Sequence, residues 1–231
     1  DKDPVITFTG ICAGPIVIQT DGLTLQGVGT AIIDGGGQDA VTVNGASRVA
    51  LAGLEIRAGL HGLVALNGAH LTLNDVNVHD NLASGISIRI GSSVVLTGVA
   101  TGQNGLHGLD VQNGSSAWVS GSLTAAGNGV FGINVNGSAL SLSQAIVSAT
   151  GNAVGIQIAT GANVFINDAD SAINATGNLS TGLTILSNAH LAAFGGTINL
   201  SDNTGVGVSL SSKAGMDLDA ATTLNSFNNG D

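Results

Sequence analysis

Residues 104–111 read NGLHGLDV, and residues 128–135 read NGVFGINV. In both octapeptides a glycine is followed by two aliphatic residues with one polar residue between them. The same glycine anchor recurs along the chain at Gly62, Gly85, Gly108, Gly132, Gly155, Gly182 and Gly207, and Ala40 fits one step earlier. These anchors give a period of about 24 residues, and a fixed period of this size is typical of solenoid proteins.

Each step contains two further pairs of alternating aliphatic residues. The second pair follows the anchor by about nine residues, as in Leu140/Leu142, and the third is less regular, as in Val76/Val78. Alternation with period two is typical of strands with one buried face. Because three strands of three to five residues cannot enclose a core alone, equivalent strands of successive steps must pair in parallel, about 4.8 Å apart.

The fold class is therefore predicted to be all-β. We expect a single-stranded right-handed parallel β-helix, a solenoid of about nine coils of about 24 residues, with three short strands per coil. Residues 1–231 should form a single domain of this kind. A left-handed helix of hexapeptides is the alternative, but its coil is shorter than the step observed here.

An asparagine stands three or four residues before most anchors. The six in register are Asn81, Asn104, Asn128, Asn152, Asn178 and Asn203. Asparagine tolerates the left-handed turn conformation and can hydrogen-bond its equivalent in the next coil. The sequence therefore predicts an asparagine ladder.

The glycine anchors and the asparagine column resemble the pectate-lyase-like superfamily of right-handed parallel β-helices, over residues 22 to about 228. Residues 9–27 look like the first coils of bacterial exported β-helix proteins. The resemblance implies a secreted or cell-surface bacterial protein whose signal peptide has been removed. Relatives usually close the N-terminal end with an amphipathic helix, and no helical pattern precedes Ile6. We therefore expect a fragment lacking its cap, end-to-end self-association, or frayed ends.

Composition excludes several partners. The net charge is −10 with only five Lys and Arg, which excludes nucleic acid and anionic membranes as partners. No apolar run is long enough to insert into a membrane.

The lone Cys12 forms no internal disulfide; we expect a small buried side chain, or a partner in a removed upstream segment.

The resemblance implies enzymes that cleave acidic polysaccharides. Such enzymes need cationic side chains to bind the uronate groups, a base or paired carboxylates, and often calcium. The polygalacturonase motifs Asn-Thr-Asp, Asp-Asp, Gly-His-Gly and Arg-Ile-Lys do not occur. The steps between anchors vary little in length, so no long loops are expected to enclose a pocket. No cofactor or metal is predicted. The Asp-x-Asp pairs Asp168/Asp170 and Asp217/Asp219 are typical of calcium ligands, but no Gly-Gly-x-Gly-x-Asp repeat supports them.

The best candidate ligand-binding patch lies on the first strand of three neighbouring coils. Its outward residues are Ser87, Arg89, Asp110, Gln112, Asn134 and Asn136. Arg89 and Asp110 are expected to form an exposed ion pair, on either a solvated face or a shallow sugar-binding strip. Trp118 and Phe165 should point outward from the second strand, as an aromatic platform or a partner contact.

Other candidate positions are weaker. Arg57 is expected beside His79 and Asp80, and His61 and His107 are expected to be turn histidines with local hydrogen bonds.

We expect a non-catalytic extracellular scaffold, or a shallow glycan-binding or adhesion module, whose partner is a polysaccharide or another protein. The alternative is a polysaccharide lyase, hydrolase or epimerase that acts on an extended glycan along the first strand face; this rests on resemblance alone. A self-assembling or ice-contacting solenoid ranks last, because the outward positions are too mixed for a flat Thr-rich array.

Overall fold

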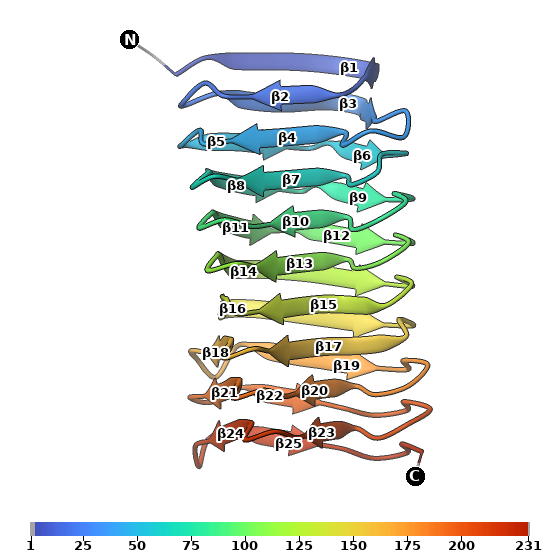
Figure 1. Ribbon diagram of the computed structural model, residues 1–231, viewed down its shortest axis with the longest axis vertical. Helices are drawn as coiled ribbons and strands as arrows, with labels where there is room; N and C mark the ends of the chain where they lie inside the picture. The colour runs from blue at the N-terminus through green and yellow to red at the C-terminus, as the bar shows by residue number, and fades with distance from the viewer. Residues whose placement is uncertain (1–2, 231) are drawn as a thin grey trace.

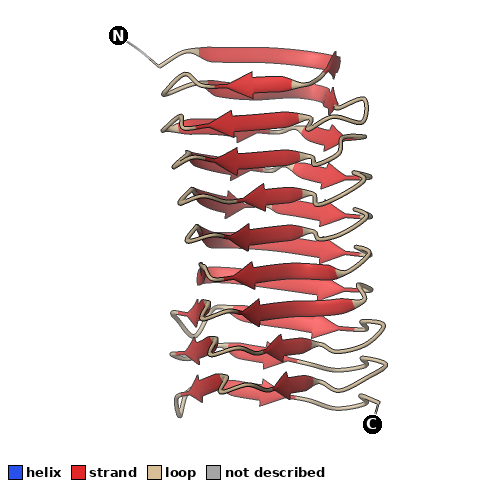
Figure 2. Ribbon diagram, in the orientation of Figure 1, coloured by secondary structure: helices blue, strands red, loops and turns tan. Residues whose placement is uncertain are grey.

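The computed structural model describes residues 3–230, in which the chain winds into a stack of parallel strands joined by turns (Figure 1). The described part of the chain contains no helix, as Figure 2 shows, and thus none that could cross a membrane. The strands form two sheets, one of sixteen strands and one of nine, called sheet A and sheet B here.

Sheet B contains the first strand of each coil, the one that follows the glycine anchor. Its members, in spatial order, are β2 (Ile16–Ile18), β4 (Val41–Asn44), β7 (Leu63–Leu66), β10 (Ile86–Ile88), β13 (Leu109–Gln112), β15 (Phe131–Asn136), β17 (Val154–Ala159), β20 (Leu183–Ile185) and β23 (Val208–Leu210).

Sheet A contains the second and third strands of the coils. Its members are β1 (Val5–Ala13), β3 (Thr24–Asp34), β5 (Val49–Ala52), β6 (Glu55–Arg57), β8 (His70–Asn74), β9 (Asn77–His79), β11 (Ser93–Thr97), β12 (Val99–Gly102), β14 (Ser116–Ala126), β16 (Ala139–Thr150), β18 (Asn163–Ile166), β19 (Ala172–Thr176), β21 (His190–Ala193), β22 (Thr197–Asn199), β24 (Gly215–Leu218) and β25 (Thr223–Asn225).

The core consists of columns of aliphatic side chains that run along the stack. In one column Leu109 pairs with Ile133, and Ile133 pairs with Ile156, all in parallel register. These side chains are at most 1% exposed. The period-two pattern thus becomes a continuous interior, because each coil supplies the same inward positions to the next. The predicted right-handed parallel β-helix of about nine three-stranded coils is confirmed.

The prediction of uniformly short strands is wrong in several coils. β14 has 11 residues and β16 has 12, because the second and third strands continue through the corner between them. The pairing of these two strands shifts register between Val119 and Gly121, and Gln144 has a φ of 50°. A bulge of this kind bends a strand without ending it, so a corner is turned without a loop.

The asparagine ladder is confirmed and gains a seventh member, Asn229. The Oδ1 of Asn152 accepts two hydrogen bonds from Asn128, one from its backbone N–H (2.8 Å) and one from its side-chain Nδ2 (3.0 Å). The Nδ2 of Asn152 donates in turn to Ala125 O and to Asn178 Oδ1. The left-handed conformation belongs to the residue before the ladder position, such as Asp80 with φ 52°, and not to the ladder asparagine.

A shorter ladder of serines lies beside the turn after sheet B. The hydroxyls of Ser92, Ser115 and Ser138 each accept a backbone N–H from the preceding coil, at 3.1 to 3.2 Å. The sequence analysis missed this ladder, because serine is frequent in the chain and its register becomes evident only after the coils are aligned.

Cys12 is partly exposed, so the expectation of a buried side chain is wrong. It lies on β1 opposite Ile33 of β3. In residues 3–230, β1 is the first strand of the stack and pairs with β3 alone, so nothing covers its other edge.

Candidate functional site

The outer face of sheet B carries one central column of side chains that point away from the core. In parallel register the column runs through Val17, Thr42, Val64, Ser87, Asp110, Asn134, Gln157, Thr184 and Ser209. We use the name sheet-B strip for the polar residues of this face on the four neighbouring coils of β10, β13, β15 and β17, namely Ser87, Arg89, Asp110, Gln112, Asn134, Asn136 and Gln157.

A hydrogen-bond network centred on Asp110 connects three coils of the strip. Gln112 Nε2 donates to Asp110 Oδ2 at 2.8 Å, and Asn134 Nδ2 donates to Asp110 Oδ1 at 2.8 Å. Gln157 Nε2 donates to Asn134 Oδ1 at 3.1 Å. The structure therefore brings Asp110, Gln112 and Asn134 together, as expected, and adds Gln157. Arg89 and Asn136 lie on the same face, without a side-chain bond to this network.

The expected exposed ion pair of Arg89 with Asp110 is not found among residues 3–230. Asp110 is 6% exposed, Asn134 is 8% exposed and Ser87 is 1% exposed, so these positions point outward but are shielded by their neighbours. Two charge-neutral amides satisfy the carboxylate in place of the guanidinium. The accessible part of the strip is formed by the half-buried Arg89, Gln112, Asn136 and Gln157.

His107 lies on the turn that leads into β13, near the carboxylate of Asp110. Its ring stacks on Phe131, with ring centroids 5.0 Å apart, and its Nδ1 accepts the N–H of Phe131 at 3.4 Å. Burial lowers the pKa of His107, and the negative charge of Asp110 opposes that shift only in part. The ring is therefore mainly neutral at pH 7, with its proton on Nε2 as a donor. The sequence analysis placed His107 in a turn but missed this contact.

A second cluster, the third-strand cluster, lies on sheet A and consists of Asp34, Glu55, Arg57, His79 and Asp80. Arg57 Nη1 is 3.0 Å from Glu55 Oε1, and Arg57 Nε is 3.9 Å from Asp34 Oδ2. His79 Nδ1 is 2.7 Å from Asp80 Oδ2, and His79 Nε2 is 3.3 Å from Glu55 Oε1. The expected grouping of Arg57 with His79 and Asp80 is present, and two carboxylates complete it.

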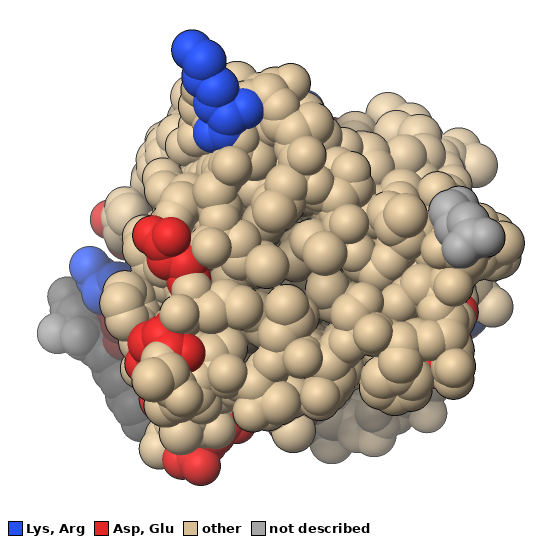
Figure 3. All heavy atoms as spheres, turned by 90° about the horizontal axis from the view of Figure 1, so that it is seen from below, with Lys and Arg blue, Asp and Glu red and all other residues tan. Residues whose placement is uncertain are grey.

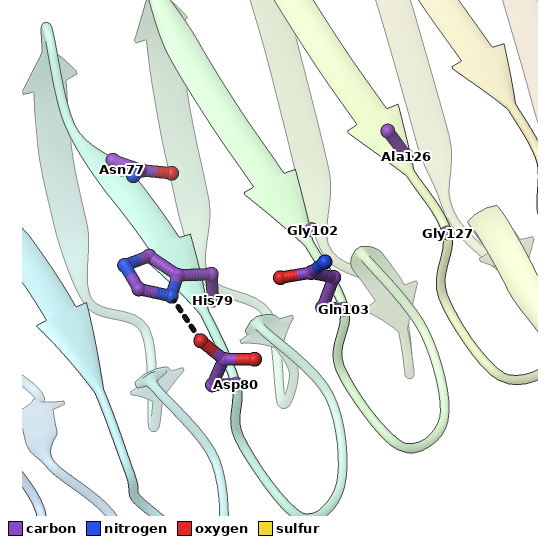
Figure 4. A pocket seen from close by; sticks show the side chains of 7 residues that line it. All are labelled: Asn77, His79, Asp80, Gly102, Gln103, Ala126 and Gly127. Carbon is purple, nitrogen blue, oxygen red and sulfur yellow. Dashed lines mark hydrogen bonds and ion pairs between the residues drawn. The ribbon is translucent and has the colours of Figure 1, made fainter.

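A shallow pocket of about 470 Å³ adjoins this cluster. Figure 4 shows the side chains of Asn77, His79 and Asp80 on one side of it. Its remaining lining comes from Gln103 and from the small residues Gly102, Ala126 and Gly127. The pocket exists because the register positions next to His79 carry almost no side chain. Loop length, on which the sequence analysis relied, does not detect such a depression.

Trp118 is 45% exposed, and it stands in register with Val95, Ser141 and, two coils on, the half-buried Phe165. This column belongs to sheet A. Trp118 therefore lies outside the sheet-B strip, on the second strand, where the sequence analysis expected it to point outward.

One aspartate of each Asp-x-Asp pair, Asp168 or Asp219, caps a turn by accepting several hydrogen bonds. Asp168 accepts hydrogen bonds from Gln144 N (2.8 Å), the Ser171 hydroxyl (2.8 Å) and Asp170 N (3.2 Å). Burial acts to raise the pKa of Asp168, but these hydrogen bonds together lower it below its ordinary value. Within residues 3–230, no group of three or more His, Cys, Asp or Glu side chains could hold a metal ion.

The stacked parallel coils wind into a right-handed β-helix (Figure 1). Residues 16–170 match the family model described as a right handed beta helix region, so the chain belongs to this family. No curated protein matches the chain in sequence.

Among solved structures, the chain is similar to an alginate lyase from Paenibacillus sp. str. FPU-7, with a TM-score of 0.60. The likeness covers 98% of this chain and 91% of that chain, at 14% sequence identity. It extends the fold assignment over nearly the whole chain.

Proposed function

We propose that the protein binds an extended polysaccharide along the outer face of sheet B. The observation that carries the proposal is the Asp110–Asn134–Gln157 network, which holds polar groups of three successive coils in one fixed arrangement. Binding surfaces gain affinity when their polar groups are ordered before the ligand arrives. The proposal includes a location outside the cell or on its surface, in keeping with the resemblance of residues 9–27 to exported β-helix proteins.

The geometry of the stack suits a polymer. Successive strands of sheet B are about 4.8 Å apart, so equivalent positions repeat along the axis at roughly the length of one sugar ring. An extended glycan that runs along the axis would meet Gln112, Asn136 and Gln157 in successive coils. The stacked rings of His107 and Phe131 offer a face for the apolar side of a sugar at the edge of the strip.

Hydrolysis at the strip is not supported by its carboxylate content. Glycoside hydrolysis needs two carboxyl groups on opposite sides of the scissile bond. The nine strands of sheet B carry a single carboxylate, Asp110, and both of its oxygens already accept hydrogen bonds. The strip is therefore better suited to hold a glycan than to hydrolyse it.

Replacing Gln157 with alanine should weaken polysaccharide binding about tenfold, because the variant loses an accessible amide and leaves Asn134 Oδ1 without its donor. The measurement is retention on a panel of immobilised neutral and acidic polysaccharides. Gln144→Ala is the matched control, since Gln144 is exposed on sheet A, away from the strip. The proposal fails if no polysaccharide is retained, or if the two variants are retained equally.

A second candidate function is polysaccharide cleavage by β-elimination at the third-strand cluster. It is favoured by the pocket beside His79 and by the similarity of the fold to an alginate lyase. Arg57 supplies a cation that could neutralise a uronate carboxylate, but Glu55 and Asp34 already pair with it.

The ultraviolet absorbance of unsaturated sugar ends, measured after incubation with alginate and polygalacturonate, tests this candidate. Turnover that is lost in His79→Ala and kept in His70→Ala would support it, since His70 lies on β8 outside the pocket lining. An absence of turnover rejects it.

A further inference from the structure

We infer that the sheet-B strip selects neutral polysaccharides over polyuronates, an inference that rests on the proposed binding function and narrows its substrate class. This selectivity follows from which end of each side-chain amide, NH₂ or oxygen, is left for a ligand. The carboxylate of Asp110 fixes the orientation of the amides that contact it, and these fix the orientation of the amide in the next coil.

Asp110 fixes the amide orientations because an ionised carboxylate only accepts hydrogen bonds. Gln112 and Asn134 must therefore turn their NH₂ groups toward it, as their 2.8 Å contacts show. The Oδ1 of Asn134 then faces the next coil, and Gln157 must donate its own NH₂ group to that oxygen, at 3.1 Å. A single buried charge thus decides the orientation of three amides.

The consequence is that amide oxygens remain for the ligand. Each of the three bonds uses one of the two N–H groups of an amide nitrogen, so Gln112 and Gln157 each keep Oε1 as an acceptor and one N–H as a donor. Both side chains are half-buried and accessible. A sugar hydroxyl can pair with both groups, because it donates to Oε1 and accepts from the N–H, whereas a uronate carboxylate at neutral pH can only accept and is repelled by the amide oxygen.

The charges on this face support the same selectivity. A polyuronate carries a carboxylate on every sugar, and the face would need several cations to match it. The nine strands of sheet B contain one ionisable residue, the anionic Asp110, and Arg89 directly after β10 is the one cation beside it. The whole chain has a net charge of −10, which repels a polyanion at long range. Figure 3, which views the stack from below, shows how sparse charged side chains are on that end of the molecule.

The test uses two polymers that differ only in the carboxylate: alginate, and the same alginate after its carboxyl groups have been reduced to primary alcohols. Binding to each immobilised polymer is measured at low and at physiological salt. We expect the reduced polymer to bind at least about tenfold more tightly. In Asp110→Asn the preference should shrink, because an amide at position 110 no longer dictates which end of Gln112 and Asn134 faces it.

Asp75→Asn is the matched control, because it removes one negative charge from an exposed corner of sheet A and leaves the strip intact. If Asp75→Asn reduces the preference as much as Asp110→Asn, net charge explains the selectivity and the inference is overturned. It is also overturned if alginate binds as tightly as the reduced polymer and that binding is weakened by Gln157→Ala, although the binding function would then stand. Absence of any binding sensitive to Gln157 removes the proposed function itself.

Discussion

Replacing Asn152 with alanine will lower the free energy of unfolding by about 3–6 kcal/mol, since three hydrogen-bonding groups lose their partner at about 1–2 kcal/mol each. Asn152 is fully buried in the middle of the ladder. Without its side chain, the backbone N–H and the Nδ2 of Asn128 lose their acceptor, and Ala125 O loses its donor. The space left behind is too well shielded to let bulk water replace these bonds.

The control for this variant is Asn163→Ala. Asn163 is exposed and donates one long bond of 3.3 Å to Gly161 O, so its loss should cost less than about 0.5 kcal/mol. Thermal and urea unfolding followed by circular dichroism measure both variants. Amide hydrogen exchange should show faster exchange centred on the coils that contain residues 128–178, because each coil of a solenoid contacts mainly its neighbours. Equal stability of the two variants would contradict the structural role given to the ladder.

Replacing Gly132 with alanine will destabilise the protein by about 3 kcal/mol or more, through overpacking. A Cβ on Gly132 would lie 2.6 Å from Asn152 Nδ2, 2.7 Å from Gly155 O and 3.0 Å from Ala149 Cβ. None of these atoms can move away freely, since the ladder holds Asn152 and the pairing of β15 with β17 holds the backbone at Gly155. The glycine is needed here because two coils approach closely, and not because of an unusual φ.

Gly114→Ala separates crowding from backbone strain. Gly114 has open space around its Cα but a φ of 72°, so alanine there should cost only about 1–2 kcal/mol from the left-handed conformation. The same unfolding measurements apply to both variants. If Gly132→Ala is no less stable than Gly114→Ala, the anchor glycines do not serve close coil packing, and their recurrence needs another explanation.

The sequence was sufficient to predict the fold because the coils repeat. Once the anchors at Gly108 and Gly132 are aligned, parallel register follows for every position between them, and so do the core columns and the asparagine ladder. The merging of strands in β14 and β16 could not be predicted in this way. It depends on a local bulge at Gly121 and on a left-handed Gln144, and glutamine is not a residue that normally signals a turn.

The candidate site was predicted in part for the same reason. Asp110 and Asn134 occupy the same anchor position in neighbouring coils, so their contact follows from alignment alone. Gln157 occupies that position one coil further on, and the alignment contained this signal although it was not used. The low exposure of Asp110 could not be read from the sequence, because it depends on how side chains such as Gln112 and Asn134 pack against the carboxylate.

The asparagine ladder also gives the stack a direction. In every rung the Nδ2 donates toward the following coil and the Oδ1 accepts from the preceding one. The side-chain dipoles therefore all point the same way, with their N–H ends toward the C-terminal end of the stack. A coil inserted in the opposite sense would set two amino groups or two carbonyls against each other. The solenoid can consequently be extended only by coils whose chain runs in the same sense, and the asparagine at this position selects for that sense.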